Sequence, residues 1–204
     1  SNPMKDYQKE FIEFALEKQV LKFGEFTLKS GRTSPYFFNA GLFNSGNQFA
    51  TLADYYAQKI AQSNIKYDVL FGPAYKGIPL VAAISTVLAL KYGIDIPYAF
   101  DRKEAKTHGE GGVFVGADIA GKKVLLVDDV MTAGTAFYES YDKLKAIGAK
   151  IVGVALSIDR QEKAKDSNIS ATKKISQDFN IPVLAVTNFE SIFEYVKENL
   201  DQEM

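Results

Sequence analysis

The stretch VLLVDDVMTAGTA, residues 124–136, decides the fold. It begins with a short apolar run, typical of a buried strand, and passes through a turn of small residues into the start of a helix. Asp128 and Asp129 directly follow the strand, at the end where α/β sheets bind ligands. Backbone N–H groups at the start of a helix attract anions, so the turn at 132–135 predicts a phosphate site. The paired carboxylates suit a polyhydroxylated sugar or a hydrated magnesium ion.

Strands and helices alternate on both sides of this stretch. Further apolar runs predict strands at 68–71, 96–100, 150–158 and 181–186, and helical spacing predicts helices at 78–92, 135–147, 171–179 and 189–199. Apolar strands separated by helices indicate an α/β fold with a mainly parallel sheet covered on both faces.

The first residues do not follow this alternation. Helical spacing at 6–22, extended stretches at 26–28 and 35–40 around a turn, and a second helix at 45–63 are predicted. We therefore expect residues 4–204 to form one domain, with a small N-terminal helix and hairpin cap, the hood, over about 4–44 and an α/β core over 45–204. Residues 1–3 resemble an expression scar.

Composition limits the possible functions. The 204 residues include 24 Lys and Arg against 25 Asp and Glu, a formal net charge of -1, so we expect neither nucleic acid nor a membrane as a partner. The absence of cysteine excludes disulfides and thiolate catalysis, and the single histidine excludes a two-histidine metal site. No apolar stretch is long enough to span a bilayer, so a cytoplasmic protein is expected.

A second strand-to-helix elbow, FGPAYKGIPL at 71–80, also has the features of an anion site. Gly72, Ala74 and Gly77 allow close approach to the backbone, and Lys76 offers a positive charge. The alternative is an ordinary elbow with a surface lysine.

The segment 101–118 lacks an apolar face and contains several glycines. Arg102, Lys103, Lys106 and His108 lie close together in it, which predicts a mobile lid that closes over a polyanion. The alternative is a solvated charged loop.

Two further features point to recognition of a planar anion. In the stretch 26–41, Phe37 and Phe38 are adjacent, so one is expected to pack inward while the other stacks on a planar ring. Arg160 follows the strand after the phosphate turn and could bind a carboxylate. The alternatives are two core phenylalanines and a surface ion pair.

Residues 124–136 resemble the 5-phosphoribosyl 1-diphosphate (PRPP) signature of the type I phosphoribosyltransferases at every position. Together with KSGRTSPYFF at 29–38, GPAYKG at 72–77 and RKEAKTHG at 102–109, they closely resemble the orotate branch of that family. The resemblance extends from the N-terminal helix through Arg160.

This resemblance implies transfer of the phosphoribosyl group from PRPP to orotate, giving orotidine 5′-monophosphate and pyrophosphate in de novo pyrimidine synthesis. It implies Mg²⁺ carried by PRPP near Asp128 and Asp129, a pyrophosphate loop at 71–80 with a non-proline cis peptide, and a homodimer with shared active sites. The implied PRPP residues are Lys29, Tyr75, Lys76, Arg102, Lys103, Lys106, His108, Asp128, Asp129, Val130, Met131, Thr132, Ala133, Gly134, Thr135 and Ala136. Among these, catalytic roles are implied for Lys29, Lys76, Arg102, Lys106, His108, Asp128 and Asp129. The implied orotate residues are Phe37, Phe38, Thr132 and Arg160.

Two other functions fit parts of the pattern. An enzyme of the same fold could act on a purine or on uracil, but Arg160 favours a base that brings a carboxylate. A PRPP-sensing regulator that binds nucleic acid would need a basic face or a helix-turn-helix, and the balanced charge disfavours it.

Overall fold

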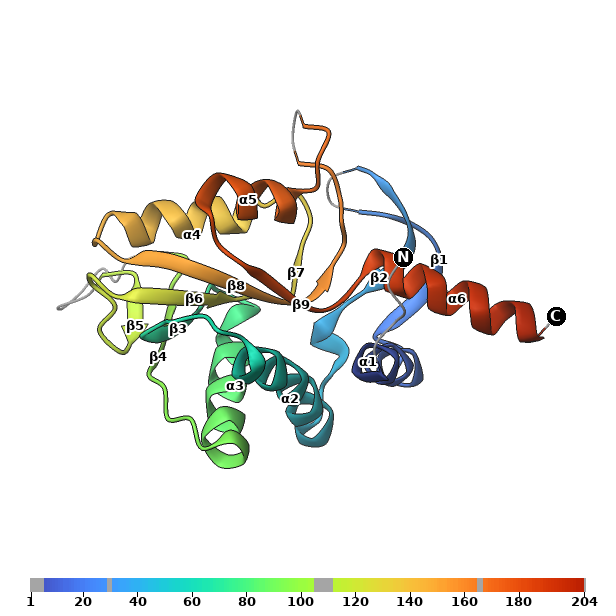
Figure 1. Cartoon of the computed structure of the whole chain (residues 1–204), viewed down its shortest axis with the longest axis horizontal. Coiled ribbons are helices and arrows are strands. Elements are labelled where there is room, and N and C mark those ends of the chain that lie inside the picture. Colours follow the sequence, from blue (N-terminus) through green and yellow to red (C-terminus); the bar gives the residue numbers. More distant parts are fainter. Residues whose placement is uncertain (1–5, 29–30, 105–111, 165–166, 204) are drawn as a thin grey trace.

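The computed structural model describes residues 6–28, 31–104, 112–164 and 167–203, and its centre is a mainly parallel sheet (Figure 1). The parallel strands are β3 (Val69–Gly72), β4 (Tyr98–Asp101), β6 (Lys123–Val127), β7 (Val130–Met131), β8 (Lys150–Asp159) and β9 (Val183–Asn188). Strand β5 (Phe114–Gly116) runs antiparallel along β4 at one edge. The predicted α/β architecture is confirmed.

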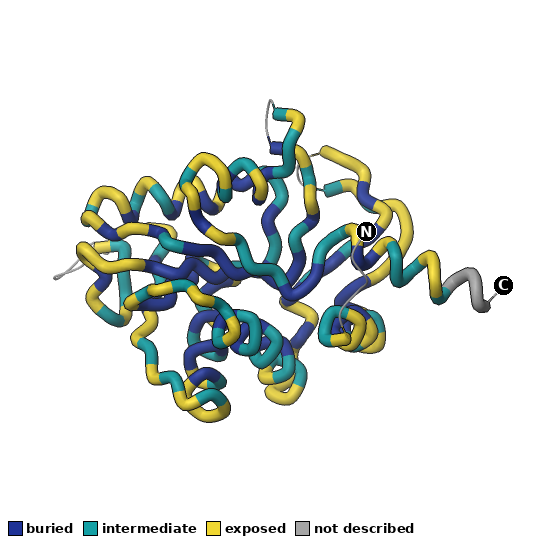
Figure 2. The backbone as a smooth tube through the Cα atoms, viewed as in Figure 1, coloured by how far each residue is buried: buried dark blue, intermediate teal, exposed yellow. Residues whose placement is uncertain are grey.

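Helices cover both faces of this sheet. The helices on the two faces are α2 (Gly46–Gln62) and α3 (Gly77–Tyr92) on one, and α4 (Thr135–Lys145) and α5 (Ala171–Phe179) on the other (Figure 1). Leu125 and Val127 of β6 join the first hydrophobic cluster, whereas Val124 and Leu126 join the second. Side chains alternate between the faces of a strand, so a sheet covered on both sides needs such unbroken apolar strands. Figure 2 shows the buried positions concentrated along the strands.

The N-terminal helix and hairpin are also present. They comprise α1 (Asp6–Glu17), the antiparallel strands β1 (Leu21–Thr27) and β2 (Thr33–Phe38), and a short 3-10 turn, η1 (Ala40–Leu42). The predicted helix at 6–22 was too long, because Gln19 takes a left-handed backbone (φ 60°) that ends it, and Leu21 begins β1. The last helix, α6 (Phe189–Glu203), lies beside α1 (Figure 1).

The segment 101–118 is only partly a loop. Asp101 ends β4, and β5 pairs with β4 through Phe114, whose ring packs on Phe71 with centroids 5.9 Å apart. The expectation that the segment has nothing apolar to bury was therefore wrong. Residues 105–111, on which the predicted mobility falls, lie outside the described residues. In the part of the chain that the structure describes, no helix combines the length and apolar character needed to cross a membrane.

Candidate active site

Asp128 and Asp129 lie at the end of β6, and hydrogen bonds fix their backbone. The Tyr56 hydroxyl, from α2, donates to the carbonyl oxygen of Asp128 at 2.7 Å. The backbone N–H of Ser157 donates to the carbonyl oxygen of Asp129 at 2.9 Å, and its hydroxyl donates to the same oxygen. The Asp129 carboxylate accepts from the N–H of Val130 at 2.8 Å. Both acids are thus held by buried partners on neighbouring elements.

The two carboxylates differ in their electrostatic surroundings. Burial, with a further contribution from the charge of Asp129, raises the pKa of Asp128 to about 7. The Asp129 side chain is 9% exposed, and its Oδ2 lies 3.4 Å from the Lys76 ammonium. Ribose hydroxyls and a divalent cation are ligands that would compensate the repulsion between the two acids.

The predicted phosphate turn leads directly into α4. Gly134 precedes the helix with φ 89°, a left-handed conformation that other residues rarely adopt. Because the first N–H groups of a helix lack intrahelical partners, the turn and the start of α4 offer donors to an anion. A cavity of about 330 Å³ is lined by most of the predicted PRPP residues here: Asp128, Val130, Met131, Thr132, Gly134, Thr135 and Ala136.

The elbow between β3 and α3 depends on close contact between two glycines. A Cβ atom on Gly72 would lie 2.0 Å from the carbonyl oxygen of Gly77, so no side chain fits there. A non-proline cis peptide joins Ala74 and Tyr75, as the resemblance implied. The Ala74 N–H donates to the buried carboxylate of Asp101 at 2.7 Å. This arrangement places Lys76 beside the acid pair.

The described end of the cationic segment approaches the same elbow. The Lys103 ammonium lies 5.8 Å from the centre of the Tyr75 ring, and Tyr75 is 70% exposed. Arg102 donates to the carbonyl oxygen of Gly112 at 3.2 Å. The remaining predicted cations, Lys29, Lys106 and His108, lie outside the described residues.

The adjacent phenylalanines have different environments. Phe38 is buried and packs against Phe11, with ring centroids 6.2 Å apart, so the expected inward ring is confirmed. Phe37 is half-buried and packs against Phe26, with centroids 5.5 Å apart. Stacking of Phe37 on a substrate ring stays a prediction.

Arg160 lies beside the phosphate turn, because Asp159 pairs with Met131 in the parallel register of β8 and β7. It is 6% exposed, so it is not a surface ion pair. Its guanidinium reaches the inner face of β2, where it binds Ser34 and lies over the ring of Tyr36. It thus contacts the buried side of the strand that carries Phe37.

Sequence reasoning missed the residues that hold the site in place. The partners of the acid pair, Tyr56 and Ser157, were not predicted, although a buried tyrosine on an inner helix face usually requires a partner for its hydroxyl. Glu139, which also lines the cavity at the phosphate turn, and Asp101 were missed as well. Nothing in the local sequence marks Asp101, because its partner, Ala74, is on another strand end.

Known proteins share this sequence and fold. The family model for the phosphoribosyl transferase domain matches residues 42–186. The orotate phosphoribosyltransferase of Hahella chejuensis is 55% identical over 196 residues, covering 96% of this chain and 90% of the relative. That of Vibrio parahaemolyticus is 56% identical over 195 residues, covering 96% and 91%.

A crystal structure of orotate phosphoribosyltransferase from Francisella tularensis is 83% identical, with a TM-score of 0.85, and the match covers 93% of this chain and 91% of that one. A PRPP complex of the Mycobacterium tuberculosis enzyme, at 20% identity and a TM-score of 0.66, shares the fold. With the signature motifs in place at the ends of β3 and β6, the chain belongs to the orotate phosphoribosyltransferases, within the wider phosphoribosyltransferase domain family.

Proposed function

We propose that the chain transfers the 5-phosphoribosyl group from PRPP to orotate, giving orotidine 5′-monophosphate and pyrophosphate in pyrimidine synthesis. One observation carries the proposal: Asp128 and the phosphate turn line a single cavity, while the adjacent Asp129 is buried against Lys76 and Arg160 lies next to the turn. This arrangement suits a phosphorylated sugar that carries a leaving pyrophosphate on one side and meets an anionic base on the other.

The proposed chemistry relies on positioning and charge. The bond from ribose C1 to pyrophosphate breaks as orotate N1 bonds to C1, the proton on N1 passes to the departing pyrophosphate or to water, and positive charge develops on the sugar. Asp128 and Asp129 hold the ribose hydroxyls and favour that positive charge, while residues 132–136 hold the 5′-phosphate. Tyr75, Lys76, Arg102 and Lys103, with Lys29, Lys106 and His108, neutralise the pyrophosphate.

Magnesium fits this site as a partner of PRPP. Carboxylate oxygens are ligands that the ion prefers, and Asp128 and Asp129 provide them. Among the described residues, no group of three or more potential metal ligands is present. We assign most of its ligands to the substrate, because Mg²⁺ usually takes only one or two protein carboxylates together with substrate phosphates, and when bound the ion supplies charge neutralisation for the leaving pyrophosphate.

Base recognition is assigned to the hood and to Arg160. Phe37 is proposed to stack on the orotate ring, Phe38 to support it from the core, and Thr132 and Arg160 to bind its polar groups. Purines and uracil lack the carboxylate that Arg160 is proposed to bind, which favours orotate over them.

A direct assay tests this function. Orotate absorbance should fall when PRPP and Mg²⁺ are added, and hypoxanthine, adenine and uracil should give no comparable reaction. Arg160→Ala should lower kcat/KM for orotate by about 2–4 kcal/mol of transition-state stabilisation, with PRPP affinity little changed. Equal losses for both substrates would show that Arg160 is only structural, and turnover of another base in place of orotate would refute the assignment.

We further propose a cytoplasmic homodimer with shared active sites, in which the lid of one subunit completes the site of the other. The family resemblance supports this proposal. Asp129→Asn and Lys106→Ala, each of low activity, should complement when refolded as an equal mixture, because random pairing gives about half heterodimers and each has one site free of both defects. Activity equal to the average of the parents, despite proven subunit exchange, would place Lys106 in its own chain's site.

A further inference from the structure

Arg160 is held at three points, two of them on the inner face of the hood and one on the segment after β8. Its Nε donates to Glu162 Oε1 at 3.0 Å, its Nη2 donates to Ser34 Oγ at 2.8 Å, and its guanidinium carbon lies 4.4 Å from the centre of the Tyr36 ring. Ser34 is itself fixed, since its hydroxyl donates to the Tyr36 carbonyl oxygen at 2.7 Å. Together these contacts set both the position and the plane of the guanidinium.

The contacts leave part of the guanidinium available. A guanidinium has five N–H donors, of which Glu162 and Ser34 each take one. Among the described residues, Nη1 of Arg160 has no hydrogen-bond partner. The remaining donors lie on Nη1 and Nη2, the pair of nitrogens that binds a carboxylate in a bidentate manner.

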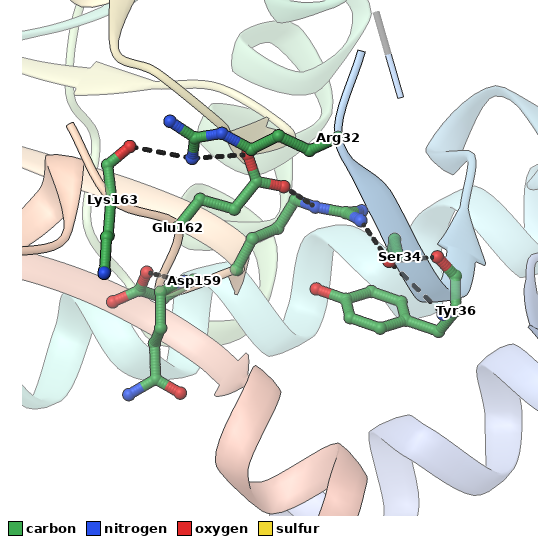
Figure 3. Close-up of polar contacts among 8 residues, drawn as sticks. Arg32, Ser34, Tyr36, Asp159, Glu162 and Lys163 are labelled. Carbon is green, nitrogen blue, oxygen red and sulfur yellow. Dashed lines mark hydrogen bonds and ion pairs between the residues drawn. The ribbon is translucent and has the colours of Figure 1, made fainter. Parts of the chain in front are cut away.

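Glu162 is shared between two arginines. Its Oε1 binds Arg160, while its Oε2 lies 3.7 Å from Nη1 of Arg32, which also donates to the carbonyl oxygen of Lys163 at 2.9 Å (Figure 3). The Glu162 side chain is 13% exposed, and Oε2 is buried without a hydrogen bond. Glu162 thus holds Arg160 through a charged hydrogen bond, while its second oxygen faces Arg32, whose side chain is 43% exposed.

Arg160 and Glu162 both line a cavity of about 230 Å³ between β2 and the segment after β8, together with Ser34 and Tyr36. Both oxygens of Glu162 face arginines. A carboxylate would repel a carboxylate-bearing substrate, so Glu162 is suited to act through Arg160 rather than on the base itself.

We infer that Glu162 is a positioning residue for base recognition: it orients Arg160, with Ser34 as a second support, so that the free edge of the guanidinium meets the carboxylate of the base. The inference rests on the proposed function and extends it to two residues that bind no substrate. It also gives the hood a direct part in base choice, because Arg32, Ser34 and Tyr36 belong to the hairpin segment, whereas Arg160 and Glu162 follow β8.

The test measures both Michaelis constants in Glu162→Gln, which keeps the size of the side chain and an acceptor for Nε but removes the charge. KM for orotate should rise about tenfold, while KM for PRPP and kcat change by less than about twofold. Glu162→Asp keeps the charge and should fall between wild type and Glu162→Gln. Ser34→Ala is a smaller change and tests the same inference if Glu162→Gln folds poorly. It should raise KM for orotate by about threefold. Asp54→Asn, which breaks a surface ion pair with Lys91, is the matched control and should leave both constants unchanged.

A double-variant cycle separates positioning from general support of the fold. In the Arg160→Ala background, Glu162→Gln should have no further effect on KM for orotate, because its action passes through Arg160. Additive losses, an equal rise in both Michaelis constants, or an unchanged KM for orotate in both Glu162→Gln and Ser34→Ala would overturn the inference. Lack of any orotate-dependent consumption of PRPP by the wild-type protein would instead overturn the proposed function.

Discussion

At the scale of single residues, Asp128 couples the site to pH. Its pKa of about 7 in the folded chain lies above the ordinary value of 3.8 for an aspartate, because burial penalises the charged form. The folded chain holds the Asp128 proton more tightly than the unfolded chain, so protonated Asp128 contributes its full stability below about pH 4. That contribution is lost as the pH rises through about 7. Asp128→Asn abolishes this titration. The free energy of unfolding of the wild type should therefore fall, relative to that of the variant, between pH 4 and pH 8.

Urea unfolding at several pH values measures this difference. Asp142→Asn, an exposed position on α4, serves as the control and should follow the wild type at every pH. Parallel pH curves for wild type and Asp128→Asn would contradict the assigned titration.

At the scale of elements, the sequence predicts helices and strands that have a local pattern or cap. It misses elements that form only by pairing with a distant part of the chain. Helix α5 has its predicted bounds, and α4 starts at Thr135, because a serine N-cap and a left-handed glycine are local signals. Strand β7 was missed because two residues are too few to show the alternating pattern of a strand. The strand exists only because it pairs with the end of β8. The start of β1 was missed because a glutamine, not a glycine, ends α1.

The candidate site divides in the same way. The acid pair, the phosphate turn and Lys76 could be predicted, since each follows a recognisable strand end within one short stretch. Their supports could not, because Tyr56, Asp101 and Glu162 act on residues brought near only by the folded sheet or the hood. A charged side chain with a distant partner looks like any solvated charge in the sequence.

At the scale of the whole molecule, the hood and the core share one hydrophobic cluster. Phe11 of α1 and Phe38 of β2 belong to the same cluster as Leu125 of β6 and Ile84 of α3. Phe11 is fully buried, with its ring 5.4 Å from that of Tyr55 on α2. Because this packing joins the two parts, we expect the hood to unfold together with the core rather than as a separate unit.

Phe11→Ala tests that coupling. Loss of the buried ring should cost about 3–5 kcal/mol of unfolding free energy, and the unfolding transition should stay single. Native-state hydrogen exchange should then show protection falling in peptides of β6 as well as in those of β1 and β2, since a shared core transmits the loss. Leu90→Ala, at a side chain that is 85% exposed, should change stability by less than about 0.5 kcal/mol. If protection fell only within residues 6–38 while β6 kept its wild-type protection, the hood would be an independent unit. Its contacts with Arg160 would then loosen without unfolding of the phosphate turn.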